Sequence, residues 1–188
     1  VFTITLFDIS IERWRRYNSK IQKLSCTDEL TGLLNRRGVK QVVDFQMQQA
    51  QIIQRETSLI MVDIDNFKKI NDQYGHYQGD LVLRHVADIL KQNLRANDVI
   101  ARYGGEEFVV LLPFTSIENA VALAEGCRKA LQQSSIAVNE TERLYVQACF
   151  GVSSTARMDF DYMKLFGQAD KPLYQAKHNG KNQVRTFS

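Results

Sequence analysis

The sequence has few cysteines, no long apolar run and no dense cluster of basic residues. Its three cysteines, Cys26, Cys127 and Cys149, are odd in number and far apart, so they match neither a disulfide framework nor a metal-binding spacing. We expect three reduced, unreactive thiols, as is usual in the cytoplasm. No segment approaches the roughly 20 apolar residues that a membrane helix needs, and no signal peptide is visible.

The charge is mild and evenly spread. The net charge is +3, and the basic residues are scattered rather than gathered into a stripe, which argues against a nucleic-acid-binding protein. A length of 188 residues with 44% hydrophobic and 24% charged residues suits one well-buried core. The chain begins at Val1 rather than at methionine. We therefore expect a cytoplasmic domain of a longer protein, whose remainder could include a membrane anchor or a sensor.

The first 25 residues have a pattern of their own. Residues 2–6 alternate apolar and polar side chains, which predicts a short strand. From Ser10 the apolar residues recur at spacings of three and four, which predicts a helix with a heptad-like stripe. This stripe consists of Trp14, Tyr17, Ile21 and Leu24. Two heptads leave two interpretations open, a parallel linker helix pair and a helix lying on its own domain.

The remainder alternates strand and helix patterns. Apolar runs predict strands over residues 59–65, 99–103, 108–112, 144–152 and 183–187, and helical periodicity predicts helices over 35–55, 83–94, 117–131 and 162–178. A single helical turn over 66–71 precedes an expected loop that holds Gly75 and Gly79. The order β-α-β-β-α-β after a leading helix predicts an α+β fold, with one sheet and helices on its faces.

Carboxylates converge on one part of this predicted sheet. Asp63 ends a buried strand, and Glu106 and Glu107 follow a Gly-Gly pair that predicts a tight hairpin with positive φ. If the hairpin pairs beside that strand, the three like charges need protonation or a cation. Mg²⁺ suits such oxygen ligands, and two ions can stabilise both oxygens of a displacement at phosphorus. Taken alone, the pattern more often indicates a helix cap at Asp63 and two solvated turn residues at Glu106 and Glu107.

Four motifs connect these carboxylates to a known family. Residues 102–108, RYGGEEF, resemble the defining hairpin of the GGDEF family of diguanylate cyclases. Residues 28–37, DELTGLLNRR, resemble its opening motif, residues 63–80 its second motif, and residues 169–182 its closing motif. The resemblance implies a catalytic domain over residues 26–188 with a fold similar to the palm of nucleotidyl cyclases. Residues 1–25 would then be the end of an upstream domain and a linker helix.

The resemblance implies a metal site on the carboxylates. The family's metal ligands correspond to Asp63, the backbone carbonyl of Ile64, and Glu106, with Glu107 assisting. Two Mg²⁺ ions per active site are implied, with Mn²⁺ as an alternative. Glu106 is also the family's candidate base for the attacking 3′-hydroxyl group. Asp65 is then expected to cap the short helix that follows it.

The same resemblance implies a GTP site. The backbone amides of Asn66 and Phe67, at a helix start, would cradle phosphate oxygens, and Lys68 would stabilise the transition state. Asn71 and Asp80 match the family's guanine-binding residues. A buried carboxylate at Asp80 would accept hydrogen bonds from guanine that adenine cannot offer, so the site should reject ATP.

Two lysines near the C-terminus match the family's contacts to the terminal phosphates. These are Lys177 and Lys181, and Lys181 stands where the family usually has arginine. Lysine supplies a point charge without the bidentate fork of arginine, so weaker γ-phosphate binding is expected. Pro172 is expected in the first turn of a helical segment, where its missing N–H is harmless.

Arg95 and Asp98 lie at the position of the family's Arg-x-x-Asp product-inhibition site. The resemblance implies that cyclic di-GMP binds there through arginine–phosphate contacts. The alternative is a helix-terminal arginine and a turn aspartate.

The implied reaction constrains assembly. Each domain has one guanine site, yet two GTP molecules must react with one another, so two chains have to meet as a homodimer and release two pyrophosphates. Residues 8–13 resemble the end of a PAS sensor domain, which implies an upstream sensor in the same chain. Two other functions stay open, a non-catalytic module that binds GTP or cyclic di-GMP, and cyclisation of a single nucleotide.

Overall fold

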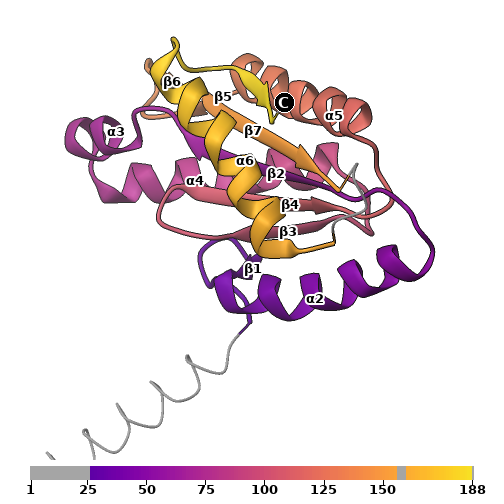
Figure 1. Cartoon of the computed structure of the whole chain (residues 1–188). Coiled ribbons are helices and arrows are strands. Elements are labelled where there is room, and N and C mark those ends of the chain that lie inside the picture. Colours follow the sequence, from indigo (N-terminus) through magenta and orange to yellow (C-terminus); the bar gives the residue numbers. More distant parts are fainter. Residues whose placement is uncertain (1–25, 156–159, 188) are drawn as a thin grey trace, which may run out of the picture.

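The α+β prediction is confirmed. The computed structural model describes residues 26–155 and 160–187, and shows a six-stranded sheet with helices on both faces (Figure 1). The strand predicted at residues 2–6, the helical stripe after Ser10 and the domain division after residue 25 lie outside the described residues. They stay predictions.

The sheet has the order β1-β3-β4-β2-β7-β8. The outer pairs β1–β3 and β7–β8 are parallel, and the three inner pairs are antiparallel. The strands are β1 (Leu34–Asn35), β2 (Ser58–Ile64), β3 (Val99–Arg102), β4 (Glu107–Leu112), β7 (Ala148–Ser154) and β8 (Val184–Thr186).

Strand β2 lies in the middle, and all of its residues are buried. A strand covered on both faces needs apolar side chains in both directions, which explains its unbroken apolar run. Because successive side chains alternate, Ile60, Val62 and Ile64 join one core cluster while Leu59 and Met61 join the other. The same alternation places Asp63 on the face of Leu59 and Met61.

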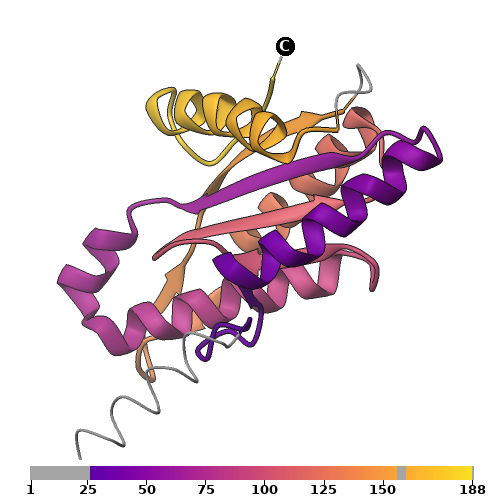
Figure 2. The same ribbon diagram turned by 60° about the horizontal axis from the view of Figure 1, so that its bottom comes forward.

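Helices divide between the two faces of the sheet. One face is covered by α3 (Phe67–Tyr74), α4 (His76–Asn93) and α5 (Ile117–Gln133). The other is covered by α2 (Arg36–Ile52) and α6 (Tyr162–His178). Figure 2 shows α6 and α4 on opposite sides of the strands. Asp63 therefore faces α6.

Polar caps fix where the helices begin. The Asn35 side chain accepts hydrogen bonds from the amides of Arg37 and Gly38 at the start of α2. Asp161 does the same for Met163 and Lys164 at the start of α6. Such caps satisfy amides that have no partner within the helix. They explain why these two helices start within one residue of the predicted positions.

Two predicted boundaries are wrong. The strand expected over residues 144–152 is interrupted: β6 (Arg143–Tyr145) pairs with β5 (Ser135–Ala137) in a separate two-stranded sheet, and β7 starts afresh at Ala148. The loop expected around Gly75 and Gly79 is confined to Gly75, whose φ is +83°, and Gly79 lies within α4. The prediction treats Gly75 and Gly79 alike as helix-breaking residues, but the packing of α4 overrides that weak preference at Gly79.

The placement of Pro172 is also corrected. It lies in the interior of α6 and is buried, rather than in a first turn. Its missing N–H costs the helix one hydrogen bond. Its neighbours Ala169 and Leu173 pack directly on Gly151 of β7, so contact with the sheet holds the helix together across the proline.

Candidate active site

The glycine turn joins β3 to β4. The amides of Tyr103 and Gly104 both donate to the carbonyl of Glu107, at 2.8 and 3.3 Å. The prediction of positive φ at this turn is wrong, because neither Gly104 nor Gly105 has it. Gly104 gives room to a side chain instead: a Cβ there would lie 2.7 Å from Oε2 of Glu107. The absent side chain lets the Glu107 carboxylate lie against the turn.

The hairpin pairs directly beside β2, as the metal-site prediction requires. Asp63 lies opposite Glu107 on β4 and opposite Cys149 on β7. The amide of Ile64 donates to the carbonyl of Glu106 at 3.3 Å. Asp63 and the two glutamates thus gather at the end of β2.

The electrostatics of Asp63 reflect this crowding. Burial, with the charges of Glu106 and Glu107, raises the pKa of Asp63 to about 6, against the opposing effect of Lys177. The Nζ atom of Lys177, from the last turn of α6, lies 2.6 Å from Oδ2 of Asp63. Although burial lowers the pKa of Lys177, its bond to Asp63 and the nearby glutamates raise it overall. The carboxylates of the site therefore favour a cation nearby, and the ammonium group of Lys177 is a cation that contacts Asp63.

A pocket of about 310 Å³ opens at this point. It contains six of the predicted site residues, drawn from three motifs that are far apart in sequence. Its lining consists of Asp63, Ile64, Asp65, Asn66, Glu106, Lys177, His178 and Lys181. His178 was not predicted: it lies within the closing motif, but the resemblance assigns functional contacts there only to Lys177 and Lys181. Seven predicted site residues do not line this pocket: Phe67, Lys68, Asn71, Asp80, Arg95, Asp98 and Glu107.

The start of α3 forms one wall. Asn66 adopts a left-handed conformation with φ of 58°, and its side chain does not cap the helix. Its Oδ1 atom instead accepts from Nζ of Lys181 at 2.6 Å. Phe67 is buried and Lys68 is exposed. The Asn66 side chain therefore leaves the first amides of α3 uncapped and instead binds the ammonium group of Lys181.

Asp65 does not have the predicted capping role. Its carboxylate accepts a hydrogen bond from the Cys149 thiol at 3.1 Å and from the amide of Asn182 at 2.9 Å. It is buried, so it faces β7 and the closing motif rather than the helix start. Burial and the Asp65 carboxylate raise the pKa of Cys149 to about 12, which agrees with an unreactive thiol. Asp65 thus joins the second motif to the closing one.

The two predicted guanine-binding residues lie on α3 and α4. Asn71 lies over Gly79, where its Oδ1 atom occupies the place that a Cβ would take. Asp80 is exposed, which corrects the expectation of a buried carboxylate there. It lies between the buried residues Gly79 and Val82, on the solvent-exposed side of α4.

Arg95 and Asp98 lie in the connection between α4 and β3. The amide of Arg95 donates to Oδ2 of Asp98 at 2.8 Å, and the amide of Asp98 donates to the carbonyl of Arg95 at 3.0 Å. Asp98 therefore shapes a turn, as the structural alternative expected. Both residues also line a second pocket of about 870 Å³ that includes Arg55 and shares no lining residue with the first.

The described residues contain neither a cluster of metal-binding side chains nor a helix that could span a membrane. In residues 26–155 and 160–187, no three His, Cys, Asp or Glu side chains are placed so that they could hold a metal ion. Over the same residues, no helix has the length and apolar character required to cross a membrane.

The comparisons with known proteins agree with this geometry. The family profile described as "Diguanylate cyclase, GGDEF domain" matches residues 25–183. The chain belongs to the GGDEF family. The match includes the glycine turn, both lysines of the pocket and the buried Asp63.

Several members of the GGDEF family are close relatives. The response regulator PleD of Caulobacter vibrioides is 43% identical over 163 residues, which cover 86% of this chain and 36% of PleD. The active GGEEF domain of a diguanylate cyclase from Vibrio cholerae is 34% identical with a TM-score of 0.78, over 83% of this chain and 98% of that one. The GGDEF domain of DgcB from Caulobacter crescentus, in complex with c-di-GMP, is 29% identical with a TM-score of 0.82, over 87% and 93%.

The chain spans between about a third and a half of the length of three curated relatives that it matches, namely 36%, 34% and 50%.

Proposed function

We propose that this GGDEF domain is a diguanylate cyclase that condenses two GTP molecules into cyclic di-GMP. In each half-reaction a 3′-hydroxyl oxygen bonds to the α-phosphorus of the other GTP. The bond between that phosphorus and the β-phosphate oxygen breaks, and pyrophosphate leaves. The observation that carries the proposal is the pocket in which carboxylates and lysines of three motifs meet at the end of β2.

Glu106 is the proposed base. Its side chain lines the pocket, and its backbone carbonyl is fixed by the Ile64 amide. With its backbone fixed by this bond, Glu106 presents a carboxylate that takes the proton of the attacking hydroxyl group and passes it to solvent. General base catalysis of this kind contributes about 10²–10⁴-fold to a rate.

The donor set fits Mg²⁺. Asp63, the Ile64 carbonyl and Glu106 are hard oxygen donors, and burial together with the charges of Glu106 and Glu107 raises the pKa of Asp63, which a bound cation would offset. Protein side chains alone do not complete a metal site in the described residues, which suits an ion that also binds substrate phosphates. When bound, Mg²⁺ neutralises phosphate charge and stabilises the attacking and leaving oxygens. Two Mg²⁺ ions, or Mn²⁺, are part of the proposal.

The start of α3 and the lysines in and beside the pocket are proposed to bind phosphates. The first amides of α3, at Asn66 and Phe67, face the region that Lys181 reaches, and Lys68 lies exposed one residue later. Lys177 binds Asp63 in this structure, and with Asp63 among the residues that would hold the metal ion, its ammonium group would be available to the terminal phosphates. Lys181, as a point charge, binds the γ-phosphate less tightly than an arginine would.

Asn71 and Asp80 are proposed to bind guanine. Incubating the purified protein with Mg²⁺ and either GTP or ATP, followed by chromatography, tests this directly. Cyclic di-GMP should form from GTP, and no cyclic dinucleotide should form from ATP. Equal turnover of the two nucleotides would contradict the assignment of these residues.

Replacing Gly79 by alanine tests the position of Asn71. The added Cβ displaces the amide of Asn71 but meets only the end of a flexible side chain, so the fold should persist. Loss of one guanine contact is worth about a tenfold rise in KM for GTP, with kcat less affected. Steady-state kinetics measure this. Gly126→Ala, at an open position on α5, is the control and should leave KM unchanged.

We also propose product inhibition at Arg95 and Asp98. Their pocket carries Arg55 as a further cation, and the DgcB domain was solved in complex with c-di-GMP. Arg95→Ala should raise the inhibition constant for cyclic di-GMP by about tenfold or more, because a charge-assisted contact to phosphate is lost. Initial rates at increasing product concentration measure it. Unchanged inhibition would contradict the assignment.

The reaction requires two chains, because each has one guanine site. The proposal therefore includes a homodimer in which the two pockets face one another, and an upstream sensor that controls their approach. The second candidate function is a non-catalytic module that binds GTP or cyclic di-GMP. The presence of Asp63, Glu106 and Lys177 in one pocket favours catalysis.

A further inference from the structure

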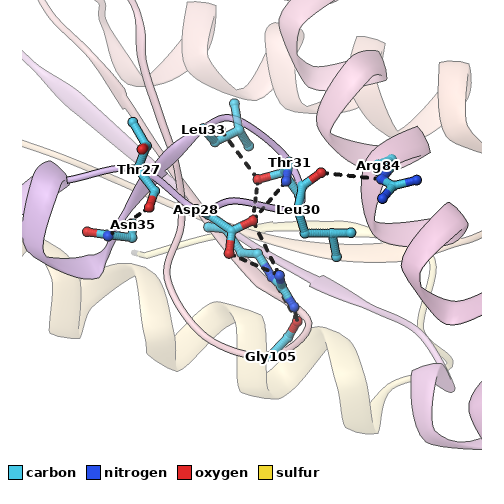
Figure 3. Close-up of polar contacts among 9 residues, drawn as sticks. Thr27, Asp28, Leu30, Thr31, Leu33, Asn35, Arg84 and Gly105 are labelled. Carbon is cyan, nitrogen blue, oxygen red and sulfur yellow. Dashed lines mark hydrogen bonds and ion pairs between the residues drawn. The ribbon is translucent and has the colours of Figure 1, made fainter. Parts of the chain in front are cut away.

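We propose that Arg102 is a positioning residue, which holds the glycine turn, and with it Glu106, in place against the opening turn of the domain. The inference rests on the proposed function, since it concerns how the candidate base is held. Asp28 and Gly105, both labelled in Figure 3, are far apart in sequence. The guanidinium group of Arg102 donates hydrogen bonds to both of them.

Arg102 uses all three of its nitrogens. Nη1 donates to both carboxylate oxygens of Asp28, at 3.3 and 3.1 Å. Nε and Nη2 donate to the carbonyl oxygen of Gly105, at 3.2 and 2.8 Å. Only a planar fork of donors can serve a carboxylate and a carbonyl in different directions at once.

The Asp28 end of this connection is rigid. Its Oδ1 atom accepts from both the amide and the hydroxyl group of Thr31, at 2.9 and 2.7 Å. Two cations from α4 hold the same turn: Arg84 donates to the Leu30 carbonyl and Lys91 to the Thr31 carbonyl. Although burial opposes it, the hydrogen bonds from Thr31 and the charge of Arg102 lower the pKa of Asp28, so it stays ionised.

The Gly105 end leads directly to the candidate base. The Gly105 carbonyl belongs to the same peptide plane as the amide of Glu106, so Arg102 orients the backbone on that side. The carbonyl of Glu106 accepts from the Ile64 amide, which orients the backbone on the other side. Both peptide planes next to Glu106 are therefore held, one by Arg102 and one by β2.

The ion pair between Arg102 and Asp28 is largely shielded from solvent. The Arg102 and Asp28 side chains are 18% and 21% exposed, so solvent screens them less than a surface pair. Removing the guanidinium frees the Gly105 carbonyl, and the glycine turn is then held by its internal bonds to Glu107 and by the bond from the Ile64 amide to the Glu106 carbonyl. A small displacement of a reacting group can cost about 10²-fold in rate.

Arg102→Met is expected to lower kcat by about 10- to 100-fold while KM for GTP changes less than about threefold, since no predicted GTP contact is touched. Arg102→Lys should recover part of the rate, because an ammonium group reaches Asp28 or Gly105 but not both. Arg84→Met is the matched control. It removes an arginine of α4 that contacts the same opening turn but not the glycine turn, so kcat should stay within about twofold of wild type.

A second measurement does not depend on activity. Hydrogen exchange in residues 103–108 should become faster in Arg102→Met than in Arg84→Met, when both have similar melting temperatures. The proposal is overturned if Arg102→Met keeps wild-type kcat, or if Arg84→Met loses as much. Unchanged exchange in residues 103–108 overturns it too. A wild-type protein that makes no cyclic di-GMP refutes the proposed function instead, and faster exchange would then still show that Arg102 holds the turn.

Discussion

Glu106→Gln is expected to lower kcat for cyclic di-GMP formation by about 10²–10⁴-fold without unfolding the protein. Glutamine keeps the shape of the side chain, and the backbone contact between Glu106 and Ile64 does not involve it. The substitution removes the carboxylate that would accept the hydroxyl proton and coordinate Mg²⁺. One charge next to Asp63 is also removed, so the pKa of Asp63 should move down toward its ordinary value.

Single-turnover kinetics with saturating GTP and Mg²⁺ measure this loss, and thermal unfolding verifies the fold. Glu140→Gln is a suitable control, because Glu140 is an exposed glutamate of the connection between β5 and β6. It should retain the wild-type rate. An undiminished rate in Glu106→Gln would remove Glu106 from the mechanism.

Gly151→Ala is expected to give the largest loss of stability. A Cβ on Gly151 would collide with the carbonyl oxygen of Ala169, and would lie 2.7 Å from the Leu173 amide nitrogen and 2.8 Å from its Cβ. These are mostly backbone atoms of α6, which cannot rotate away. Overpacking of this kind costs about 3 kcal/mol, or roughly 6–12 °C in melting temperature for a domain of this size.

The control for Gly151→Ala lies on the same helix. Gly167 is exposed on α6 and has open space around its Cβ position, so Gly167→Ala should raise stability by up to about 1 kcal/mol. Thermal and urea unfolding compare the two variants. Because α6 carries Lys177, Gly151→Ala should also weaken GTP binding at temperatures where it remains folded. Equal melting temperatures for Gly151→Ala and wild type would mean that the helix lies farther from β7.

Much of the fold was predictable because local patterns agree with it. The apolar run before Asp63 needs burial on both faces, and β2 is the central strand. Capping residues fixed the starts of α2 and α6. The failures occur where long-range packing overrides a local preference. Gly79 and Pro172 are weak helix residues in isolation, yet both lie inside helices.

The site was predictable in its membership but not in its contacts. The motifs predicted six of the eight residues that line the pocket as site residues, whereas the pairing of Lys177 with Asp63 joins residues 114 positions apart. Asp65 looked like a cap because it precedes a helix, and only the return of the closing motif shows its bonds to Cys149 and Asn182. No sequence spacing indicates such contacts, since they depend on which elements the sheet order brings together.

The most direct test of the central claim is the product balance of the purified chain. The protein, shown to be dimeric in the same buffer, is incubated with GTP and Mg²⁺, and cyclic di-GMP and pyrophosphate are quantified over time. The account predicts one cyclic di-GMP and two pyrophosphates for every two GTP consumed. GTP that binds but is not converted by a dimeric sample, or that yields a product from a single nucleotide, would contradict it.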